Sequence, residues 1–375
     1  MRRGSVLFFF VSFLLCVSLV SGLLLAEAQT QALADGEQME LRYAENYRVK
    51  IYPDGAALLT IGEKEDYLLL PSEAEVPEGM ENLARIPIPA KNIYLASSSA
   101  ADLFLQAGAL SSVRYSGTSA ENWKVPELQS ALREEEILYA GKYSAPDYEL
   151  LLTEGCGLAV ENTMILHSPA TKEKLESLGI PVLVEYSSYE PHPLGRVEWI
   201  KLYGLLSGRL EEASAFFEQQ EEIFRCAEAS EPTGKTVAFF HITPAGAVVV
   251  RRQADYVTQM IEIAGGKAAV ADLPEEENAL STVTIQMESF YAQALNADVL
   301  IYNSTTAGDV ESMEQFLALS PLLKDFKAVQ EGNVWCTEMS MFQKSSAAAE
   351  MIADFRAVLT GTANDTSLNY LHRID

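Results

Sequence analysis

Short apolar stretches alternate with segments of helical length from residue 92 almost to the end of the chain. A buried parallel strand reads as a continuous apolar run, and a helix then returns the chain to the starting edge of the sheet. The order strand, helix, strand therefore predicts an α/β fold with parallel sheets. In the first series we expect strands at 93–96, 113–115, 137–139, 158–160 and 182–184, and helices at 100–109, 125–134, 146–152 and 171–178.

A second series of the same kind follows a long uninterrupted segment. Residues 196–229 contain no proline and place apolar side chains mostly three, four or seven positions apart, which predicts one amphipathic helix. At about 1.5 Å per residue this helix would be roughly 50 Å long, enough to link two lobes. In the second series we expect strands at 237–242, 247–250, 299–302 and 334–336, and helices at 256–264, 285–294, 313–319 and 345–359.

The chain begins with the pattern of an export signal. The basic pair Arg2-Arg3 precedes an apolar run, and small residues stand at Ala26 and Ala28, as in a cleaved secretory signal peptide. An uncleaved membrane anchor is one alternative, because the run is nearly long enough to span a bilayer. A lipoprotein signal ending at Cys16 is another, although bulky leucines precede that cysteine. We therefore expect the protein in the periplasm or on the outer face of the cytoplasmic membrane.

Residues 29–84 alternate strand-like runs with turns, which predicts a β-rich segment ahead of the α/β series. The fold class is thus α/β, with two lobes of mostly parallel sheet joined by one long helix, and an extra N-terminal β segment. The expected organisation is a signal peptide at 1–28, a β-rich segment at 29–84, a first lobe at 85–195, a linking helix at 196–230 and a second lobe at 231–375.

Charge and motifs exclude several classes of function. With 53 acidic and 27 basic residues, the net charge of −26 disfavours binding to nucleic acid. The phosphate-binding glycine motifs and the common hydrolase and metalloprotease motifs are absent from the sequence, so we expect no enzyme and no cofactor. We also expect no metal site. The four histidines are scattered, and the cysteines lack metal-binding spacing, since they are Cys16, Cys156, Cys226 and Cys336.

Several motifs resemble one family, the solute-binding proteins of ABC importers for iron–siderophore, haem and cobalamin. The resemblance starts at residues 86–95 (IPIPAKNIYL), continues through residues 175–182 (LESLGIPV), and covers roughly residues 85–359. It implies two lobes linked by a long helix, a ligand cleft between them, and an ABC permease as partner. A ferric siderophore is the ligand we expect first, with haem or cobalamin as other possibilities, and we expect a monomer.

The ligand site is expected where strands of the two lobes end, since open α/β sheets bind ligands at the carboxyl ends of their strands. In the resembling family, aromatic faces and arginine forks hold the anionic chelate, which makes two adjacent arginines the leading candidates. Tyr143 and Trp335 fit a packing role equally well. The candidate ligand-binding residues are Ser98, Tyr143, Asn162, Tyr186, Arg251, Arg252 and Trp335.

Two glutamates are candidates for docking to the permease. In the resembling family one surface glutamate on each lobe pairs with permease arginines. Glu149 and Glu262 occupy the matching positions, and Glu262 is followed by the double glycine of that pattern. The alternative is that an acidic chain places glutamates on many exposed helices.

The sequence therefore predicts a non-catalytic capture protein that delivers a chelated metal to a permease. Two other functions stay open. A transport protein for bare manganese or zinc ions would share the long linking helix, although four scattered histidines disfavour it. The third hypothesis is that the protein is an extracellular binding module without a role in transport.

Overall fold

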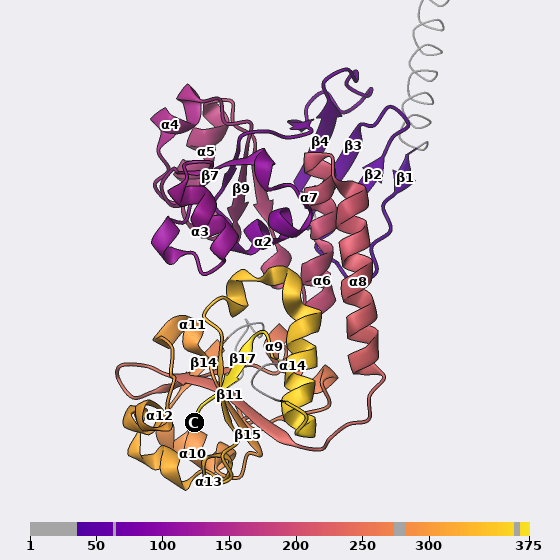
Figure 1. The fold of residues 1–375 in the computed structure, drawn as a ribbon. Helices are drawn as coiled ribbons and strands as arrows, with labels where there is room; N and C mark the ends of the chain where they lie inside the picture. The colour runs from indigo at the N-terminus through magenta and orange to yellow at the C-terminus, as the bar shows by residue number, and fades with distance from the viewer. Residues whose placement is uncertain (1–35, 63–64, 274–281, 364–367) are drawn as a thin grey trace, which may run out of the picture. The chain divides into compact units, whose positions relative to one another are not determined.

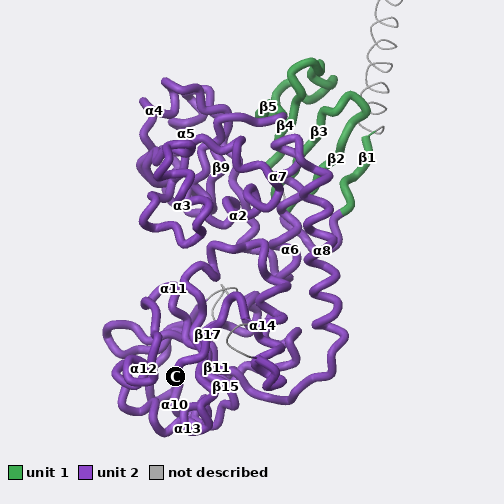
Figure 2. The backbone as a smooth tube through the Cα atoms, in the orientation of Figure 1, with its two compact units in different colours: residues 1–40, 47–88 green, residues 41–46, 89–375 purple. Residues whose placement is uncertain are grey.

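The computed structural model describes residues 36–62, 65–273, 282–363 and 368–375. The expected signal peptide, with Cys16, lies outside these residues. The chain divides into two compact units, one of residues 1–40 and 47–88 and the other of residues 41–46 and 89–375 (Figure 2). Within the described ranges, none of the helices combines the length and the apolarity needed to cross a bilayer.

The first unit is a five-stranded sheet in the order β1-β2-β3-β4-β5. Neighbouring strands are antiparallel except β4 and β5, which are parallel. Tyr47 and Val49 are buried while Arg48 between them is exposed, which is the period-two pattern of a half-buried strand. The sheet extends past the predicted boundary at residue 84: β1 is Glu37–Gln38, β2 Tyr47–Ile51, β3 Ala57–Ile61, β4 Glu65–Pro71 and β5 Ala84–Ile88.

The first lobe contains a parallel sheet in the order β10-β9-β6-β7-β8. Figure 1 labels β7 and β9 of this sheet, with helices of the lobe around them. The chain leaves the central strand β6 for β7 and β8 on one side, then crosses to β9 and β10 on the other. Such a reversal makes a switch point outside the carboxyl ends of the strands, where α/β sheets bind ligands. The strands are β6 Ile93–Leu95, β7 Val113–Ser116, β8 Leu138–Tyr139, β9 Leu158–Asn162 and β10 Val182–Glu185, and the helices are α2 Ser98–Gln106, α3 Pro126–Arg133, α4 Tyr148–Thr153 and α5 Pro169–Ser177.

The second lobe contains a mixed seven-stranded sheet in the order β14-β12-β11-β15-β16-β17, with β13 beside β11. β11, β15 and β16 are parallel, whereas β12, β14 and β17 run antiparallel to their neighbours. The predicted α/β class is confirmed. The strands are β11 Thr236–Ile242, β12 Val248–Arg251, β13 Lys267–Ala268, β14 Thr282–Ile285, β15 Val299–Tyr302, β16 Val334–Thr337 and β17 Leu371–Arg373.

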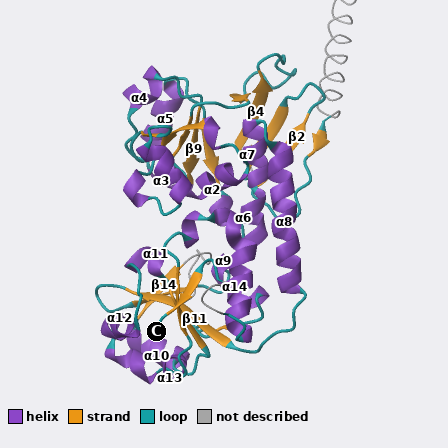
Figure 3. Ribbon diagram, viewed as in Figure 1, coloured by secondary structure: helices purple, strands orange, loops and turns teal. Residues whose placement is uncertain are grey.

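Helices of the second lobe flank this sheet (Figure 3). A core cluster centred on Phe240, Phe290 and Phe316 packs beneath them. The helices are α9 Tyr256–Ile263, α10 Met287–Ala294, α11 Ser304–Ala307, α12 Met313–Leu319, α13 Lys327–Gln330 and α14 Ala348–Thr360.

The prediction of one helix over residues 196–230 is wrong, because the chain folds back within it. Three helices replace it: α6 Pro193–Glu198, α7 Ile200–Ser207 and α8 Leu210–Glu228. Gly208 ends α7 in the left-handed conformation with φ of 71°, which glycine adopts without strain. At Gly204 a side chain would meet Ala213 of α8 at 2.5 Å, so glycine allows α7 and α8 to pack closely. The helix that links the lobes is therefore α8, with 19 residues.

The two lobes also contact each other directly. Asp102 of α2 accepts hydrogen bonds from the backbone nitrogen of Ser346 at 2.9 Å and from its hydroxyl at 2.5 Å. The amide of Gln343 bonds the backbone of Asn122 and of Lys124 at 2.9 and 2.6 Å. The segment that precedes α14 is thus fixed to the first lobe.

A short segment, residues 41–46, belongs to the second unit and anchors α6. Five consecutive backbone N–H groups donate to two buried carboxylates, one on α6 and one just before it. The backbone N–H groups of Arg42, Tyr43 and Ala44 bond Glu198, and those of Glu45 and Asn46 bond Glu190, all at 2.8–3.0 Å. This anchoring holds the helix that carries Arg196, a residue of the site below.

Candidate ligand-binding site

Exposed apolar side chains gather at the carboxyl ends of the first-lobe strands, a surface we call the first-lobe edge (residues 97–99, 117–118, 139–143, 162–167 and 186–189). Among the described residues, six large hydrophobic side chains are strongly exposed. Four of them lie at this edge: one is the last residue of β8, and three follow β9 and β10. Since such side chains gain free energy when a partner covers them, their concentration indicates a contact surface. They are Tyr139, Met164, Leu166 and Tyr189, with 40–50% of their area exposed.

A buried carboxylate beneath this edge ties its loops together. Glu185, at the end of β10, accepts hydrogen bonds from Ser97 Oγ at 2.5 Å and Ser99 Oγ at 2.7 Å. Its other oxygen accepts the backbone N–H of Ser187 at 2.8 Å. Because β9 lies between β10 and β6, the carboxylate bridges two strands that do not touch. Ser98, a predicted ligand residue, stays exposed between the two bonded serines at the start of α2.

Two other predicted residues also lie at the first-lobe edge. The ring of Tyr186 is half-buried and lies 5.8 Å from that of Tyr189. Asn162 accepts the backbone N–H of Met164 at 2.9 Å, so it fixes the turn that carries two of the exposed apolar side chains. The structure thus brings both residues to this surface.

Tyr143 is placed at the same edge, after β8. It is half-buried and packs against the core cluster of the first lobe. The structure therefore supports the packing reading of this residue, while part of its surface faces outward.

Glu161 is a buried carboxyl group one residue before the edge. It is fully buried on β9, and neither of its oxygens has a hydrogen-bond partner in the described part of the chain. Burial raises its pKa from 4.5 to about 8, because the low-dielectric interior disfavours the charged form. Glu161 therefore carries its proton at neutral pH.

The predicted position of Arg251 and Arg252 at a carboxyl edge is wrong, because β12 runs antiparallel to β11. Arg251 lies opposite the middle of β11, where it pairs with Asp255 at 3.2 Å and stands 4.5 Å from the centre of the Phe342 ring. Arg252 is buried at 6% exposure, and its carbonyl accepts the hydroxyl of Thr258 at 2.8 Å. Only Arg251 keeps part of its surface accessible.

Trp335 is also not placed at the ligand surface. It lies within β16 with 4% exposure, and its indole N–H donates to Asn333 at 2.9 Å, toward the amino end of the strand. That end is opposite the expected cleft. Trp335 is therefore a buried residue of the sheet, which agrees with the packing role given as its alternative.

Sequence reasoning missed one cation, Arg196. Its guanidinium donates to the carbonyl of Ser188 at 3.1 Å, on the first-lobe edge, and lies 3.9 Å from the ring centre of Tyr256 in the second lobe. With Tyr256, Phe342 and Lys344 it lines a small pocket. The available signal was its place eight residues after Ser188, but residue 196 was predicted to begin the long linking helix and not to follow a strand.

Both predicted docking glutamates are exposed on helices of different lobes. Glu149 lies in the first turn of α4, and Glu262 lies near the end of α9, where it accepts a hydrogen bond from Gln253. Glu262 lines an open pocket of ≈ 430 Å³ whose other walls come from α8 and the start of α6. Their role in docking stays a prediction.

The expectation of no metal site is challenged by one group of side chains. Among the described residues, one group of three side chains could hold a metal ion: Asp309, Cys336 and His372. Their potential ligand atoms all lie within 4.8 Å of one another. They are far apart in the sequence, so no spacing motif could have revealed them.

The fold is that of a known class. The sequence profile of the periplasmic binding protein family matches residues 94–338, which include most of both lobes. The chain therefore belongs to the periplasmic binding protein family, whose members are non-enzymatic components of transport.

Individual proteins resemble this chain in sequence or in fold. The uncharacterized lipoprotein MJ0872 of Methanocaldococcus jannaschii is 25% identical over 356 residues, covering 89% of this chain and 86% of that protein. The structure resembles the periplasmic haem-binding protein HutB of Vibrio cholerae, with a TM-score of 0.58, 18% identity and coverage of 73% and 99%. A periplasmic haem-binding protein of Pseudomonas aeruginosa gives a TM-score of 0.58 at 15% identity, with coverage of 76% and 98%. These structural similarities concern the fold.

Proposed function

We propose that this protein is an exported solute-binding protein that captures a metal chelate on the first-lobe edge and delivers it to an ABC permease. The ligand class is a chelate with an apolar body and anionic groups, such as a catecholate ferric siderophore or haem. The observation that carries the proposal is the concentration of exposed apolar side chains at the switch-point edge.

Cations near this edge complement the apolar surface. Arg196 joins Ser188 of the edge to Tyr256 of the second lobe, and Arg251 lies beside Phe342. Tyr256 and Phe342 contact each other with ring centres 6.3 Å apart, so the two guanidinium groups belong to one cluster. A guanidinium binds carboxylate or catecholate oxygens in a bidentate manner. The structural relatives include proteins named as haem-binding and vitamin B12-binding, which agrees with a chelate of this kind.

Titration with candidate chelates tests the proposal. The purified protein is titrated with haemin, a ferric catecholate siderophore, cobalamin, and free iron, manganese and zinc ions. The double variant Tyr139→Ala/Tyr189→Ala should weaken binding of the true ligand by about tenfold or more, as aromatic contact residues do. Saturable binding of free ions alone would favour the metal-ion transport reading instead.

Two exposed leucines provide a matched control. Leu152 on α4 and Leu322 are exposed to a similar degree but lie away from the first-lobe edge. The double variant Leu152→Ala/Leu322→Ala removes comparable apolar surface and should leave the affinity unchanged. Equal weakening by both double variants would contradict the assignment of the site.

Delivery to the permease is tested separately through the two glutamates. Charge reversal, Glu149→Lys with Glu262→Lys, should abolish uptake of the ligand by cells while leaving its affinity for the purified protein unchanged. Glu127→Lys with Glu314→Lys is the control, since both residues are exposed on helices of the two lobes. Uptake unaffected by the first pair would refute the docking role.

Location outside the cytoplasm can be tested by fractionation of cells. The relatives named as lipoproteins support the alternative in which Cys16 carries a lipid. Cleavage near Ala28 predicts soluble protein in both the wild type and Cys16→Ser. Lipid attachment predicts that only the wild type is held at the membrane.

A further inference from the structure

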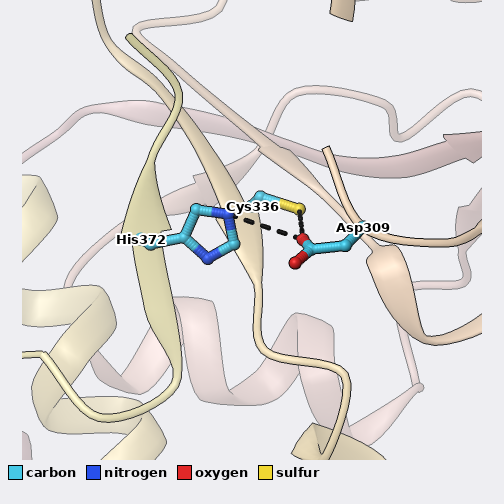
Figure 4. A group of neighbouring side chains, drawn as sticks. All are labelled: Asp309, Cys336 and His372. Carbon is cyan, nitrogen blue, oxygen red and sulfur yellow. Dashed lines mark hydrogen bonds and ion pairs between the residues drawn. The ribbon is translucent and has the colours of Figure 1, made fainter. Parts of the chain in front are cut away.

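Three chemically different side chains of the second lobe converge beside its sheet. Cys336 of β16 and His372 of β17 are directly opposite each other on antiparallel strands, so their side chains share one face. Asp309 follows α11 and points its carboxylate between them (Figure 4). Its Oδ1 lies 3.5 Å from the Sγ of Cys336 and 3.5 Å from the Nε2 of His372.

Two of the three separations match the edges of a tetrahedral metal site, and the third, between Sγ and Nε2, is within 4.8 Å. With zinc bonds of about 2.3 Å to sulfur and about 2.1 Å to nitrogen or oxygen, tetrahedral geometry places sulfur about 3.6 Å from oxygen and nitrogen about 3.4 Å from oxygen. The observed distances of 3.5 Å agree with both. A cation could therefore be bound with only small side-chain shifts.

A second carboxylate orients the histidine for such a role. Glu338 Oε1 lies 3.1 Å from Nδ1 of His372, and a hydrogen bond there leaves Nε2 directed at Asp309. This carboxylate–histidine arrangement is typical of metal sites, where it fixes the ring and its tautomer. The carbonyl oxygen of Val310 is also 3.3 Å from Nε2. Two oxygen acceptors thus face Nε2, and a cation would satisfy both them and the ring nitrogen.

We propose that Asp309, Cys336 and His372 bind one divalent transition-metal ion of the zinc type. Thiolate, imidazole and carboxylate together suit this borderline-soft ion rather than magnesium or calcium. One thiolate and one carboxylate neutralise its two charges. Asp309 and His372 are partly exposed, so the ion can enter from solvent and keep a water as fourth ligand. This site is separate from the first-lobe edge, and its existence does not depend on the proposed transport function.

Cobalt(II) is a suitable probe because its absorption reports thiolate coordination and tetrahedral geometry. The full chain with Cys16, Cys156 and Cys226 replaced by serine keeps Cys336 as its single thiol. Adding cobalt should produce a sulfur-to-metal charge-transfer band that saturates at one equivalent of cobalt. Zinc should displace the cobalt and remove the band. In the same background, Cys336→Ser should remove the band, and His372→Gln should weaken cobalt binding by about tenfold or more, as loss of a ligand or its orienting partner does.

The matched control is a protein whose single thiol is Cys156, with Cys336 replaced by serine. It should give no charge-transfer band with cobalt. Absence of a band in the protein that retains Cys336 would overturn the proposal, as would a band that persists in Cys336→Ser. A fold check by circular dichroism separates loss of ligand from loss of structure, and His372→Gln keeps the inference testable if Cys336→Ser does not fold. Chelate binding at the first-lobe edge should be the same in all these variants.

Discussion

The strand ends of the two lobes differ in what they present to solvent. In the first lobe, Glu185 binds the hydroxyl groups from below and the apolar side chains of the following turns are left exposed. In the second lobe, buried Ser304 and Thr337 bond each other, and the exposed groups that follow are the polar Asp309 and Glu338. The same kind of edge therefore serves a hydrophobic contact surface in one lobe and a set of metal ligands in the other.

In the first lobe a buried carboxylate joins two strands, whereas in the second lobe the buried hydroxyl groups join only neighbouring strands. One carboxylate organises the first-lobe edge, so its removal should affect both stability and binding. The second-lobe pair is local to two strands, so its removal should affect stability alone. The following predictions test this contrast.

The largest effect is expected from Glu185→Ala. This change leaves two serine hydroxyls and the Ser187 N–H without their acceptor in a buried site, which should lower the free energy of unfolding by about 3 kcal/mol. Ligand affinity should fall as well, because the loops lose their common anchor. Urea unfolding and chelate titration measure the two effects. Glu185→Gln keeps one acceptor and should lose less, and equal losses for both variants would contradict the account.

A somewhat smaller effect is expected from pH, through Glu161. Its pKa is raised from 4.5 in the unfolded chain to about 8 in the folded protein, so the folded state holds the proton more tightly. The contribution of this proton to the free energy of unfolding is fully present below pH 4.5, the pKa of the unfolded chain. It is lost as the pH rises through the folded pKa of about 8.

The wild type should therefore lose stability between pH 5 and pH 8, by at most about 1.4 kcal/mol per pH unit. Glu161→Gln, which is neutral and similar in shape, should show a flatter profile. Chemical denaturation at several pH values measures both curves. Parallel profiles for the two proteins would show that Glu161 is charged in the folded state.

Thr337→Val should have a moderate effect in the second lobe. It removes the hydroxyl that accepts the backbone N–H of Ser304 at 3.0 Å, and the free energy of unfolding should fall by about 1 kcal/mol. Chelate affinity should not change. Thr337→Ser restores the hydroxyl and should recover most of the stability. A loss of chelate affinity in Thr337→Val would show that the two edges are coupled.

The smallest effects are expected from the arginines of the second lobe. Arg251→Ala should weaken chelate binding by about threefold, the size of a modest charge contact. Arg252→Ala should leave affinity unchanged because the side chain is buried. Titration of both variants distinguishes them, and the reverse order would restore the original assignment of Arg252 to the site.

Apolar periodicity predicted the regular elements well where strands and helices are bounded by turns. β15 at Val299–Tyr302 and α12 at Met313–Leu319 occur at the predicted residues. The failure at α7 and α8 has a physical reason: the helical spacing of apolar residues continues through Gly208, although the chain direction reverses there.

The site could be predicted only in part. Ser98, Asn162 and Tyr186 lie at one edge as expected, because parallel strands bring the loops that follow them together. Their role in ligand binding stays a prediction. Arg251 was misplaced because the direction of β12 depends on its pairing with β11, which its own composition does not reveal. The metal-binding group was invisible because Asp309, Cys336 and His372 meet only through tertiary structure.

The most direct test of the central claim is hydrogen exchange of the protein with and without its best-binding chelate. Our account predicts that the ligand protects backbone amides at residues 139–143, 162–167 and 186–189, while amides of α4 and of residues 321–325 exchange unchanged. Protection confined to other segments, with the first-lobe edge exchanging as before, would contradict the claim that this edge binds the ligand.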